Sequence, residues 1–583
     1  MVNTAYCVIL HFKFYVNTLL KLYLIKLYIL PQANKCIVEL SYDPRERKKC
    51  KMVIKPTEII VFIVSLTASC ESGRILAIMP TPSYSHQIVF NPLWLQLNSR
   101  GHHVTLFTTD PIKNSNLSNF RQIDWNFAYK LWHEKHNVSD IINNFNKDLV
   151  KCLNQYMEMM SDIIIQELEH PGVKSIINDE NEHFDLVIAE FLIPTMIAFS
   201  KRFNCPFIGI SPMDIPNFVH EALGNPVSPA LFPDFMSPFD DQMNFFERVL
   251  NTFYYLGGKL YFRYYFYPKM DKIVKTYFGK DYPRLDDMQL NVSTIFLNIN
   301  PIIHTIKPLT RNILVVGGGT HFMKDVSLPH DIQMFLDEAE AGAIYFSLGT
   351  NVKSKDLSEG TKRIFLETFS ELPYKILWKL ESSHVTTNSN ILIKQWLPQQ
   401  AILKHRNIKL FITQGGLQSL EEAIYNTVPI IAMPVYIDQY SNVRKVMRKG
   451  IGRTLDLDKL EKQILQENIN EVVNNQKYVD SVEKLNHSDF YFRYKYAAEK
   501  LSALLREQPS GLEEAIRRAE YVMKYKGAKF LKQIDIPLYQ YLLLDVLATF
   551  LLLVCILTCF LYVFVTLIVS FIKEKRKDKT KLE

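Results

Sequence analysis

Short apolar runs alternate with longer helical segments along most of the 583-residue chain. Runs rich in Ile, Val, Leu and Phe that end in turn residues predict strands at residues 74–80, 102–109, 184–190, 206–211 and 293–300. The pattern restarts further on and predicts strands at residues 342–350, 374–380, 391–397, 408–414 and 428–435. Because helical stretches separate the strands, we predict an α/β protein with two tandem Rossmann-like, doubly wound parallel-sheet domains and a cleft between them.

The boundary between the two domains is marked by composition. Residues 313–331 contain glycines followed by proline and polar residues, and we interpret them as a linker between an N-terminal domain at 71–312 and a C-terminal domain at 332–530 that includes returning helices. A Pro-rich stretch at 224–238 predicts a long loop. The aromatic-rich run at 253–268 leaves core packing, membrane contact and an apolar acceptor pocket as open interpretations.

The C-terminal end of the chain predicts a membrane anchor. Residues 546–572 contain no charged side chain and, as a helix, would span about 40 Å, enough for a lipid bilayer. The basic tail at 573–583 is expected in the cytosol, so the body would lie on the other side of the membrane. Lys579 and Lys581 match a retrieval signal of endoplasmic reticulum membrane proteins, which predicts a single-pass protein of that membrane with a lumenal catalytic body.

The N-terminal end predicts an export signal. Residues 52–70 contain a short basic segment, an apolar run and small residues at the end, as signal peptides do. Residues 1–51 form an atypical extension, so we expect translation to begin at Met52; a genuine extension is the alternative. A lumenal body fits four glycosylation sequons, at Asn116, Asn137, Asn291 and Asn486.

Charge and cysteine content exclude two classes of protein. The net charge of +7 is concentrated at the two ends, at 1–51 and 573–583, which leaves the body close to neutral and makes nucleic acid an unexpected partner. Eight cysteines do not make a disulfide framework in a chain of this length. Cys152 and Cys205 are the two expected in the folded body, either as one disulfide or as two buried thiols.

The strand–glycine–helix segment at 411–442 predicts a phosphate-and-sugar site. Gly415 and Gly416 follow a strand and precede a helix, so a phosphate could approach the backbone and the helix N-terminus. Gln418 and Glu422 share one face of that helix, where the carboxylate could bind a ribose diol. Further polar and aromatic groups follow neighbouring strands: Asp438 and Gln439 suit sugar hydroxyls, and Trp396 offers a flat face for a base.

These residues resemble a known signature. The stretches WLPQQAIL (396–403), FITQGG (411–416) and DQYSN (438–442), together with Glu422 and Pro429, are similar to the UDP-glycosyltransferases of the UDP-glucuronosyltransferase family. The resemblance extends from about residue 72 to the tail and includes FSLGT (346–350). The stretch ITQGGLQS (412–419) resembles the corresponding stretch in the insect branch of the family, whose members use mostly UDP-glucose. The resemblance implies the GT-B glycosyltransferase fold.

The resemblance also implies roles for individual residues. It places Trp396 on the uracil, Gln399 near the nucleoside, Glu422 on the ribose, and Ser347, Thr350 and Gln418 near the phosphates. It places Asp438 and Gln439 on the transferred sugar, and Lys379 near the uridine. Gln414 departs from the family, whose members usually have His there; its amide can donate to a phosphate oxygen but carries no charge.

His86 is the predicted general base. It follows the first strand at a helix start, where the helix dipole favours the neutral imidazole. The catalytic His of the family falls at this position, and its supporting Asp matches Glu190, which is one methylene longer. We expect His86 to activate an acceptor hydroxyl for direct displacement with inversion at the anomeric carbon.

The resulting prediction is a detoxifying enzyme that transfers a hexose, expected to be glucose, from a UDP-sugar to small lipophilic phenols, steroids or xenobiotics. UDP-glucuronic acid as donor, a lipid or glycan acceptor, and a non-catalytic binding protein remain alternatives, and a homo-oligomer is left open. No cofactor and no metal are expected. Asp456 and Asp458 resemble the Asp-x-Asp pair of metal-dependent glycosyltransferases, but we interpret them as a helix N-cap.

Overall fold

The computed structural model describes residues 38–41, 49–52, 72–113, 117–144, 147–322, 327–382, 388–474, 493–527, 537–541 and 543–582. Contacts divide the chain into two units, Met1–Ser72 and Gly73–Glu583. In the first unit, β1 (Val38–Ser41) pairs antiparallel with β2 (Lys49–Met52). Apart from Met52, the predicted signal peptide at 52–70 lies outside the described residues.

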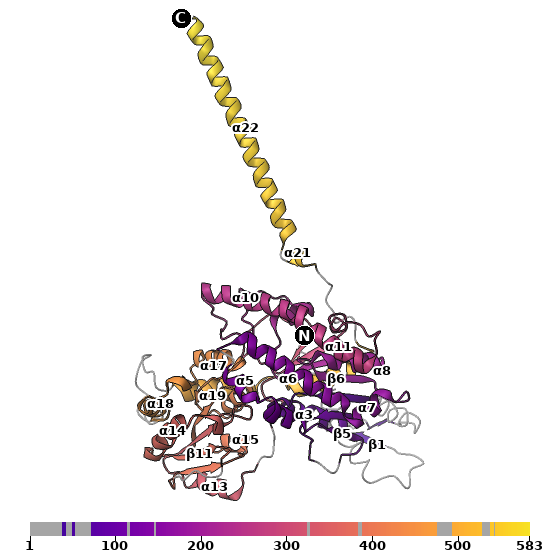
Figure 1. Cartoon of the computed structure of the whole chain (residues 1–583), viewed down its shortest axis with the longest axis vertical. Coiled ribbons are helices and arrows are strands. Elements are labelled where there is room, and N and C mark those ends of the chain that lie inside the picture. The colour runs from indigo at the N-terminus through magenta and orange to yellow at the C-terminus, as the bar shows by residue number, and fades with distance from the viewer. Residues whose placement is uncertain are drawn as a thin grey trace. The chain divides into compact units, whose positions relative to one another are not determined.

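The first sheet of the second unit has seven parallel strands in the spatial order β5-β4-β3-β6-β7-β8-β9. These strands are β3 (Arg74–Met79), β4 (His103–Thr108), β5 (Phe120–Asp124), β6 (Leu186–Glu190), β7 (Phe207–Ser211), β8 (Thr294–Leu297) and β9 (Ile313–Val315). The helices of this region (Figure 1) are α3 (Tyr84–Ser99), α4 (Ala128–Lys130), α5 (Val138–Asn144), α6 (Leu149–Glu169), α7 (Pro171–Asn178), α8 (Ala198–Phe203), α9 (Asn217–Ala222), α10 (Phe245–Tyr261), α11 (Tyr267–Phe278) and α12 (Leu285–Gln289).

The second sheet has six parallel strands in the order β12-β11-β10-β13-β14-β15. These strands are β10 (Ala343–Ser347), β11 (Lys375–Lys379), β12 (Ile391–Lys394), β13 (Ile408–Thr413), β14 (Ile430–Ala432) and β15 (Gly452–Thr454). The helices of this region are α13 (His330–Asp337), α14 (Glu359–Glu371), α15 (Gln399–Leu403), α16 (Leu417–Tyr425), α17 (Asp438–Arg448) and α18 (Lys462–Asn474).

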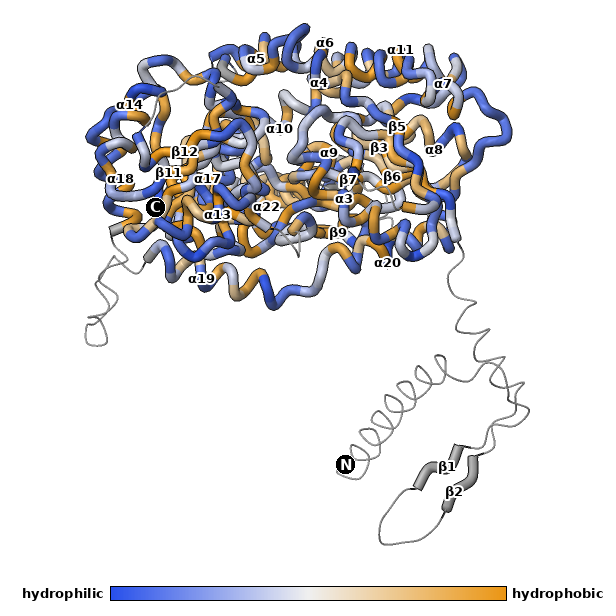
Figure 2. Tube along the Cα trace, turned by 90° about the horizontal axis from the view of Figure 1, so that it is seen from below, coloured by the Kyte–Doolittle hydropathy of each residue, from blue (hydrophilic) through white to orange (hydrophobic). Residues whose placement is uncertain are grey.

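The central strands are buried on both faces because helices cover each sheet. Every residue of β6, β7, β8 and β10 is buried, and hydrophobic positions gather around β6 and β7 in Figure 2. Parallel strands of this kind read as continuous apolar runs, which is why the sequence revealed them.

All ten predicted strands are present, and among the described residues three further strands of the two parallel sheets were missed, as were β1 and β2 of the first unit. β5, β9 and β15 are edge strands with mostly intermediate or exposed residues. β5 and β15 lack an apolar run, whereas the short apolar run of β9 is followed closely by three glycines. β9 lies at the start of the segment that the sequence analysis interpreted as a linker, and it pairs with β8. Cys152 and Cys205 are unpaired thiols.

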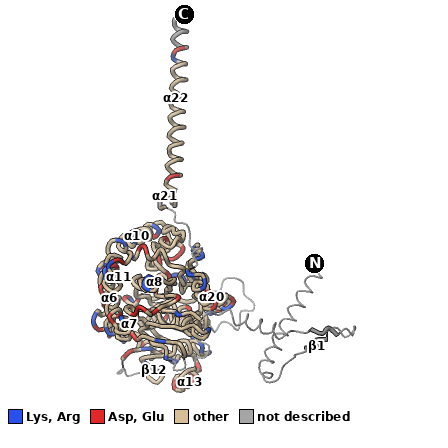
Figure 3. The backbone as a smooth tube through the Cα atoms, turned by 90° about the vertical axis from the view of Figure 1, so that its right-hand side faces the viewer, with Lys and Arg blue, Asp and Glu red and all other residues tan. Residues whose placement is uncertain are grey.

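The C-terminal helices return to both sheets before the chain ends. α19 (Arg493–Arg506) packs on α16, and α20 (Gly511–Lys524) packs on α3, where Ala515 and Ile516 join the cluster of Val89 and Leu93. After α21 (Leu538–Tyr541), α22 (Leu544–Leu582) forms one long helix. Its segment Leu544–Glu574 is long and apolar enough to cross a membrane. Figure 3 shows charged residues only near the two ends of this helix.

Candidate active site

The carboxyl ends of both sheets open on one cavity. The strand order reverses between β3 and β6 in the first sheet and between β10 and β13 in the second. Ligands of open parallel sheets bind where the strand order reverses in this way. A cavity of about 380 Å³ lies at this place, lined by residues that follow β3 and by residues at the ends of β10 and β13. Ser83, after β3, and Asn351, after β10, join the two sides through a hydrogen bond of 3.1 Å from the Asn351 amide.

His86 and Glu190 form a pair at this edge of the first sheet. His86 is the third residue of α3, which follows β3, and Glu190 is the last residue of the neighbouring strand β6. His86 Nδ1 lies 2.7 Å from Glu190 Oε1. Glu190 is fully buried, whereas His86 lines the cavity. Because Glu190 occupies Nδ1, Nε2 is the ring nitrogen that can act on a ligand.

Close packing requires glycine in the turn after β13. Gly415 has φ +84°, and a Cβ there would lie 2.2 Å from Val443 Cγ2 on α17. Gly415 itself does not line the cavity, but Gly416, which caps α16, does. The Gln414 amide lies against two glycines: a Cβ on Gly349 would meet its Nε2 at 2.3 Å, and one on Gly416 at 3.0 Å. The amide and the α16 N-terminus therefore present N–H groups at the bottom of the cavity.

Two amides hold the carboxylate of Glu422. Gln399 Nε2 donates to Glu422 Oε2 at 2.7 Å, and Gln400 Nε2 donates to Oε1 at 2.9 Å. Tyr345 in turn donates its hydroxyl to Gln399 Oε1 at 3.2 Å. Glu422 lines the cavity and is 5% exposed, so its oxygens are oriented before any ligand arrives.

A buried histidine completes the surroundings of Glu422. His321 Nε2 lies 3.2 Å from Glu422 Oε1, and its Nδ1 lies 3.8 Å from Glu421 Oε2. Burial lowers the pKa of His321, but the hydrogen bond to Glu422 and the charges of both carboxylates outweigh it, so that pKa lies above its ordinary value. Burial raises the pKa of Glu421 to about 7. Gly318 donates its N–H to Glu421 Oε1 at 3.0 Å, so Gly318 and His321, both in the segment between the sheets, contact the two carboxylates of α16.

His321, Glu421 and Gln400 were not among the residues predicted from the sequence. A signal was available, because His321 follows three consecutive glycines and Glu421 places a second carboxylate beside the predicted ribose ligand. Only the folded chain shows that the two segments meet, since 100 residues separate His321 from Glu421.

The aromatic and cationic groups predicted near the base lie at the cavity wall. Trp396 is 55% exposed and meets the Tyr84 ring edge-on, with centroids 5.1 Å apart. A flat ligand could therefore stack on Trp396. Lys379 Nζ donates to the Gly349 carbonyl at 3.0 Å and pairs with Glu381, so this cation fixes the loop after β10.

Asp438 and Gln439 begin α17 after a strained residue. Ile437 has φ +47°, a conformation that β-branched residues rarely adopt, and such strain is concentrated at functional sites. Gln439 Oε1 accepts the Val435 N–H at 2.9 Å, which turns the amide nitrogen to the other side. Asp438 accepts from Asn442 Nδ2 at 2.6 Å, and burial raises the pKa of Asp438 to about 6.

The other end of the cavity is apolar. Its wall is formed by helices α5 and α6, the turns after β6 and β7, the Pro-rich loop and Phe266. The large apolar residues are Trp132, Ile141, Leu153, Met157, Met160, Ile164, Leu192, Ile193, Met213, Phe235, Met236 and Phe266. Asp214, next to Met213, accepts hydrogen bonds from His220 and Lys307. Burial would raise the pKa of Asp214, but Lys307 and His220 outweigh it and hold that pKa well below its usual range.

The predicted donor-site residues other than Gly415 line this one cavity: Ser347, Thr350, Lys379, Trp396, Gln399, Gln414, Gly416, Gln418, Glu422, Asp438 and Gln439. Asp456 accepts the Asp458 N–H at 3.0 Å as the N-cap of a 3₁₀ turn, ahead of the helix that we expected it to cap. Asn137 and Asn291 are exposed, while Asn116 and Asn486 lie outside the described residues. The side chains of Lys579 and Lys581 are likewise not described.

Comparisons with known proteins agree with this geometry. The family model described as UDP-glucoronosyl and UDP-glucosyl transferase matches residues 73–580. UDP-glucosyltransferase 2 of Dactylopius coccus is 34% identical over 85% of this chain and 93% of its own length. An ecdysteroid UDP-glucosyltransferase of Spodoptera littoralis nuclear polyhedrosis virus is 29% identical over 81% of this chain and 92% of its own. Among solved structures, Os79 from O. sativa, in complex with U2F and trichothecene, aligns with a TM-score of 0.50 and 14% identity over 77% of this chain and all of its own.

Proposed function

Because the chain belongs to the UDP-glucoronosyl and UDP-glucosyl transferase family, we propose that it transfers glucose from UDP-glucose to a hydroxyl group of small lipophilic molecules, with inversion. The chain is a UDP-glycosyltransferase with the GT-B fold, and its donor is a UDP-sugar. The choice of glucose is supported by relatives named glucosyltransferases. The lipophilic acceptor, whether phenol, steroid or xenobiotic, is supported by the apolar end of the cavity.

The proposed chemistry is a single displacement. His86 Nε2 takes the proton of the acceptor hydroxyl, the acceptor oxygen attacks C1 of the sugar, and the bond from C1 to the diphosphate breaks with its electrons on the leaving UDP. Glu190, 2.7 Å from Nδ1, stabilises the imidazolium that forms. Donors at the α16 N-terminus and on Gln414 face the departing phosphate charge. No step of this proposal passes through a metal or a cofactor.

The observation that carries the proposal is the His86–Glu190 pair on the same cavity as the donor-site residues. It also favours an enzyme over a non-catalytic binding protein, since a protein that only binds needs no imidazole held by a buried carboxylate. Glu190 reaches Nδ1 despite the methylene by which it differs from the Asp of the family.

His86→Ala provides the test. The expected loss in kcat/KM with UDP-glucose and a phenol is about 10²–10⁴-fold, because a positioned base contributes that much. The variant should still bind UDP, as measured by calorimetry, since His86 is not one of the residues predicted to bind the nucleotide. The matched control is His103→Ala, an exposed histidine at the start of β4. If the kcat/KM of His86→Ala stays within about threefold of wild type, His86 is not the general base.

Two assays separate the remaining donors and acceptors. UDP-glucuronic acid run beside UDP-glucose tests the sugar, and ceramide run beside soluble phenols and steroids tests whether lipids are acceptors. A higher kcat/KM with UDP-glucuronic acid than with UDP-glucose would show that glucose is not the preferred sugar. A higher kcat/KM with ceramide than with phenols and steroids would show that the acceptor is a lipid.

We further propose that α22 anchors the chain in the endoplasmic reticulum membrane, with the body in the lumen. The proposal is supported by the apolar segment Leu544–Glu574 and by the basic tail after it. The exposed sequons at Asn137 and Asn291 suit a lumenal body. The intact chain should stay with microsomes in alkaline carbonate and should lose mass on glycosidase treatment. Release by carbonate would contradict the anchor.

A further inference from the structure

α10 carries an uncovered apolar face. Six large side chains form it: Phe246, Val249, Leu250, Phe253, Leu256 and Leu260. Phe246 is 75% exposed and Phe253 is 67% exposed. Their spacing places them within an arc of about 120° on an α-helix, so they form one continuous stripe, which we call the α10 face. Tyr264, 71% exposed in the π-helical turn that follows, extends the stripe beyond the helix end.

The charged residues of α10 lie beside this face and are bound within the protein. Glu247 pairs with Arg444 on α17 at 2.8 Å, and Lys259 pairs with Glu221 at 2.8 Å. Arg248 donates to the Met243 carbonyl at 3.2 Å. The α10 face itself consists of uncharged side chains, so charge cannot be what draws a partner to it.

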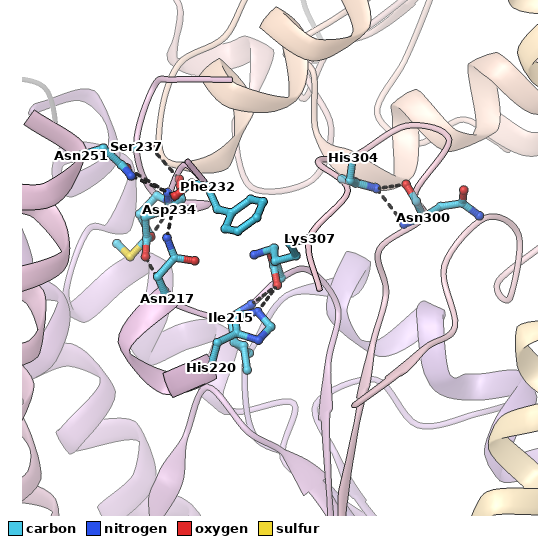
Figure 4. A network of polar contacts seen from close by, with 12 residues as sticks. Ile215, Asn217, His220, Phe232, Asp234, Ser237, Asn251, Asn300, His304 and Lys307 are labelled. Carbon is cyan, nitrogen blue, oxygen red and sulfur yellow. Dashed lines mark hydrogen bonds and ion pairs between the residues drawn. The ribbon is translucent and has the colours of Figure 1, made fainter. Parts of the chain in front are cut away.

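The helix is held firmly with this face turned outward. A capping box of Asn244 and Glu247 fixes its first turn. On the opposite side, the buried Asn251 accepts the Asp234 N–H at 2.9 Å and donates to the Phe232 carbonyl at 3.0 Å. Figure 4 shows Asn251 directed toward these two loop residues. A fixed helix that exposes several Phe and Leu side chains to water indicates a surface that another phase or molecule covers.

We propose that the α10 face docks into the interfacial layer of the lipid bilayer that α22 spans. This inference rests on the membrane anchor proposed above. The anchor brings the face to the bilayer surface, and its six large apolar side chains give the body an affinity of its own for the interfacial layer. Phe and Leu on one face of a helix, with Tyr at its end, are the side chains that suit the boundary between acyl chains and headgroups. Because the face has no charge, docking should not require anionic lipid.

The docked face would lie next to the route of the acceptor. Phe266, in the same π-helical turn as Tyr264, lines the apolar end of the cavity. The loop that Asn251 holds contributes Phe235 and Met236 to the same wall. Lipophilic acceptors concentrate in bilayers, so a wall shared by lipid and cavity shortens their path to His86.

The test separates the anchor from the docked face. A protease site is inserted between Gly527 and Pro537 of the full chain, which is reconstituted into phosphatidylcholine vesicles and then cleaved. We expect most of the wild-type body to float with the vesicles after cleavage, equally at low and high salt. In the triple variant Phe246→Glu, Leu250→Glu, Phe253→Glu, the fraction of the body released from the vesicles after cleavage should be at least about tenfold larger than in wild type. The reason is that burying each Glu in the interfacial layer costs free energy.

The matched control places three Glu on exposed apolar positions elsewhere, with Met334→Glu, Tyr496→Glu and Leu504→Glu, and should stay bound like wild type. Full release of the wild-type body, or equal retention of the triple variant, overturns the inference. Release as a dimer that the triple variant converts to monomer also overturns it, and assigns the face to a second copy. If the uncleaved chain fails to float, the anchor itself is wrong.

Discussion

His321 is the residue whose replacement tests most directly how the donor site is organised. It is fully buried between Glu421 and Glu422, and Glu422 carries the oxygens proposed to bind the ribose. His321→Gln removes the cation while it keeps a polar side chain of similar reach. We expect both the stability of the protein and its affinity for UDP to fall, because Glu422 loses a partner that fixes its carboxylate.

The size of the effect follows from the geometry. Two unit charges 3.2 Å apart attract each other by about 5 kcal/mol at an effective dielectric constant of about 20. The cost of burying the imidazolium offsets part of this attraction, and breaking a buried pair by removing one partner typically costs about 3–5 kcal/mol. We therefore expect the free energy of unfolding of His321→Gln to be lower by about 3 kcal/mol at pH 6.

The sign of the pH dependence follows from the two pKa shifts. The pKa of His321 is raised in the folded state, so its contribution is fully present below the ordinary histidine value and is lost as the pH rises through the folded value. The pKa of Glu421 is also raised, to about 7, so the folded protein binds a proton that the unfolded chain has already released. Both groups make wild type more stable at pH 6 than at pH 9, and the deficit of His321→Gln should shrink at pH 9.

Urea unfolding at the two pH values and calorimetry with UDP measure these effects. His405→Gln is the matched control, because His405 lies at the same 3.2 Å from Asp337 but that carboxylate is exposed to water. Its unfolding midpoint should hardly move. If His321→Gln loses no more stability than His405→Gln, or binds UDP as wild type does, the buried cluster does not support Glu422.

Three further predictions concern the donor site. Asp438 has a pKa of about 6, raised by burial, so the affinity for UDP-glucose should fall below pH 6 while the affinity for UDP stays level; Asp438→Asn should abolish that difference in calorimetry. Trp396→Ala should weaken UDP binding by about 10–100-fold, from the loss of about 1–3 kcal/mol of stacking, and Trp396→Phe should restore most of it; equal affinities would remove the stacked base. Gly415→Ala should lower the free energy of unfolding, measured in urea, by about 3 kcal/mol, because φ is +84° and the new Cβ would meet Val443. Gly257→Ala is the control and should not destabilise the protein, because the space around Gly257 is open.

Local sequence was enough to predict most strands of the two parallel sheets and many of the polar residues that line the cavity. Most of the ten predicted strands are buried on both faces and therefore appear as continuous apolar runs. The edge strands β5 and β15 have no such run, and β9 has only three residues. Gly416, Gln418 and Glu422 belong to one turn and one short helix, and local spacing alone sets them on a common side. Trp396 follows β12 and Asp438 follows β14 of the same sheet, and the carboxyl ends of all its parallel strands lie along one edge.

Contacts between distant segments depended on the tertiary structure. His86 on α3 and Glu190 at the end of β6 are 104 residues apart in the chain. His321, in the segment between the sheets, meets Glu421 and Glu422 on α16. The sequence also left open whether the aromatic run at 253–268 faces the core or the outside. The bonds of Asn251 to the Pro-rich loop turn Phe253, Leu256 and Leu260 outward, whereas Phe266 and Tyr267 near the end of the run are buried. Periodicity reports which positions share a face of one element, because it arises from local backbone geometry. It carries no information about what that face meets, since the partner is selected by packing and hydrogen bonding over the whole chain.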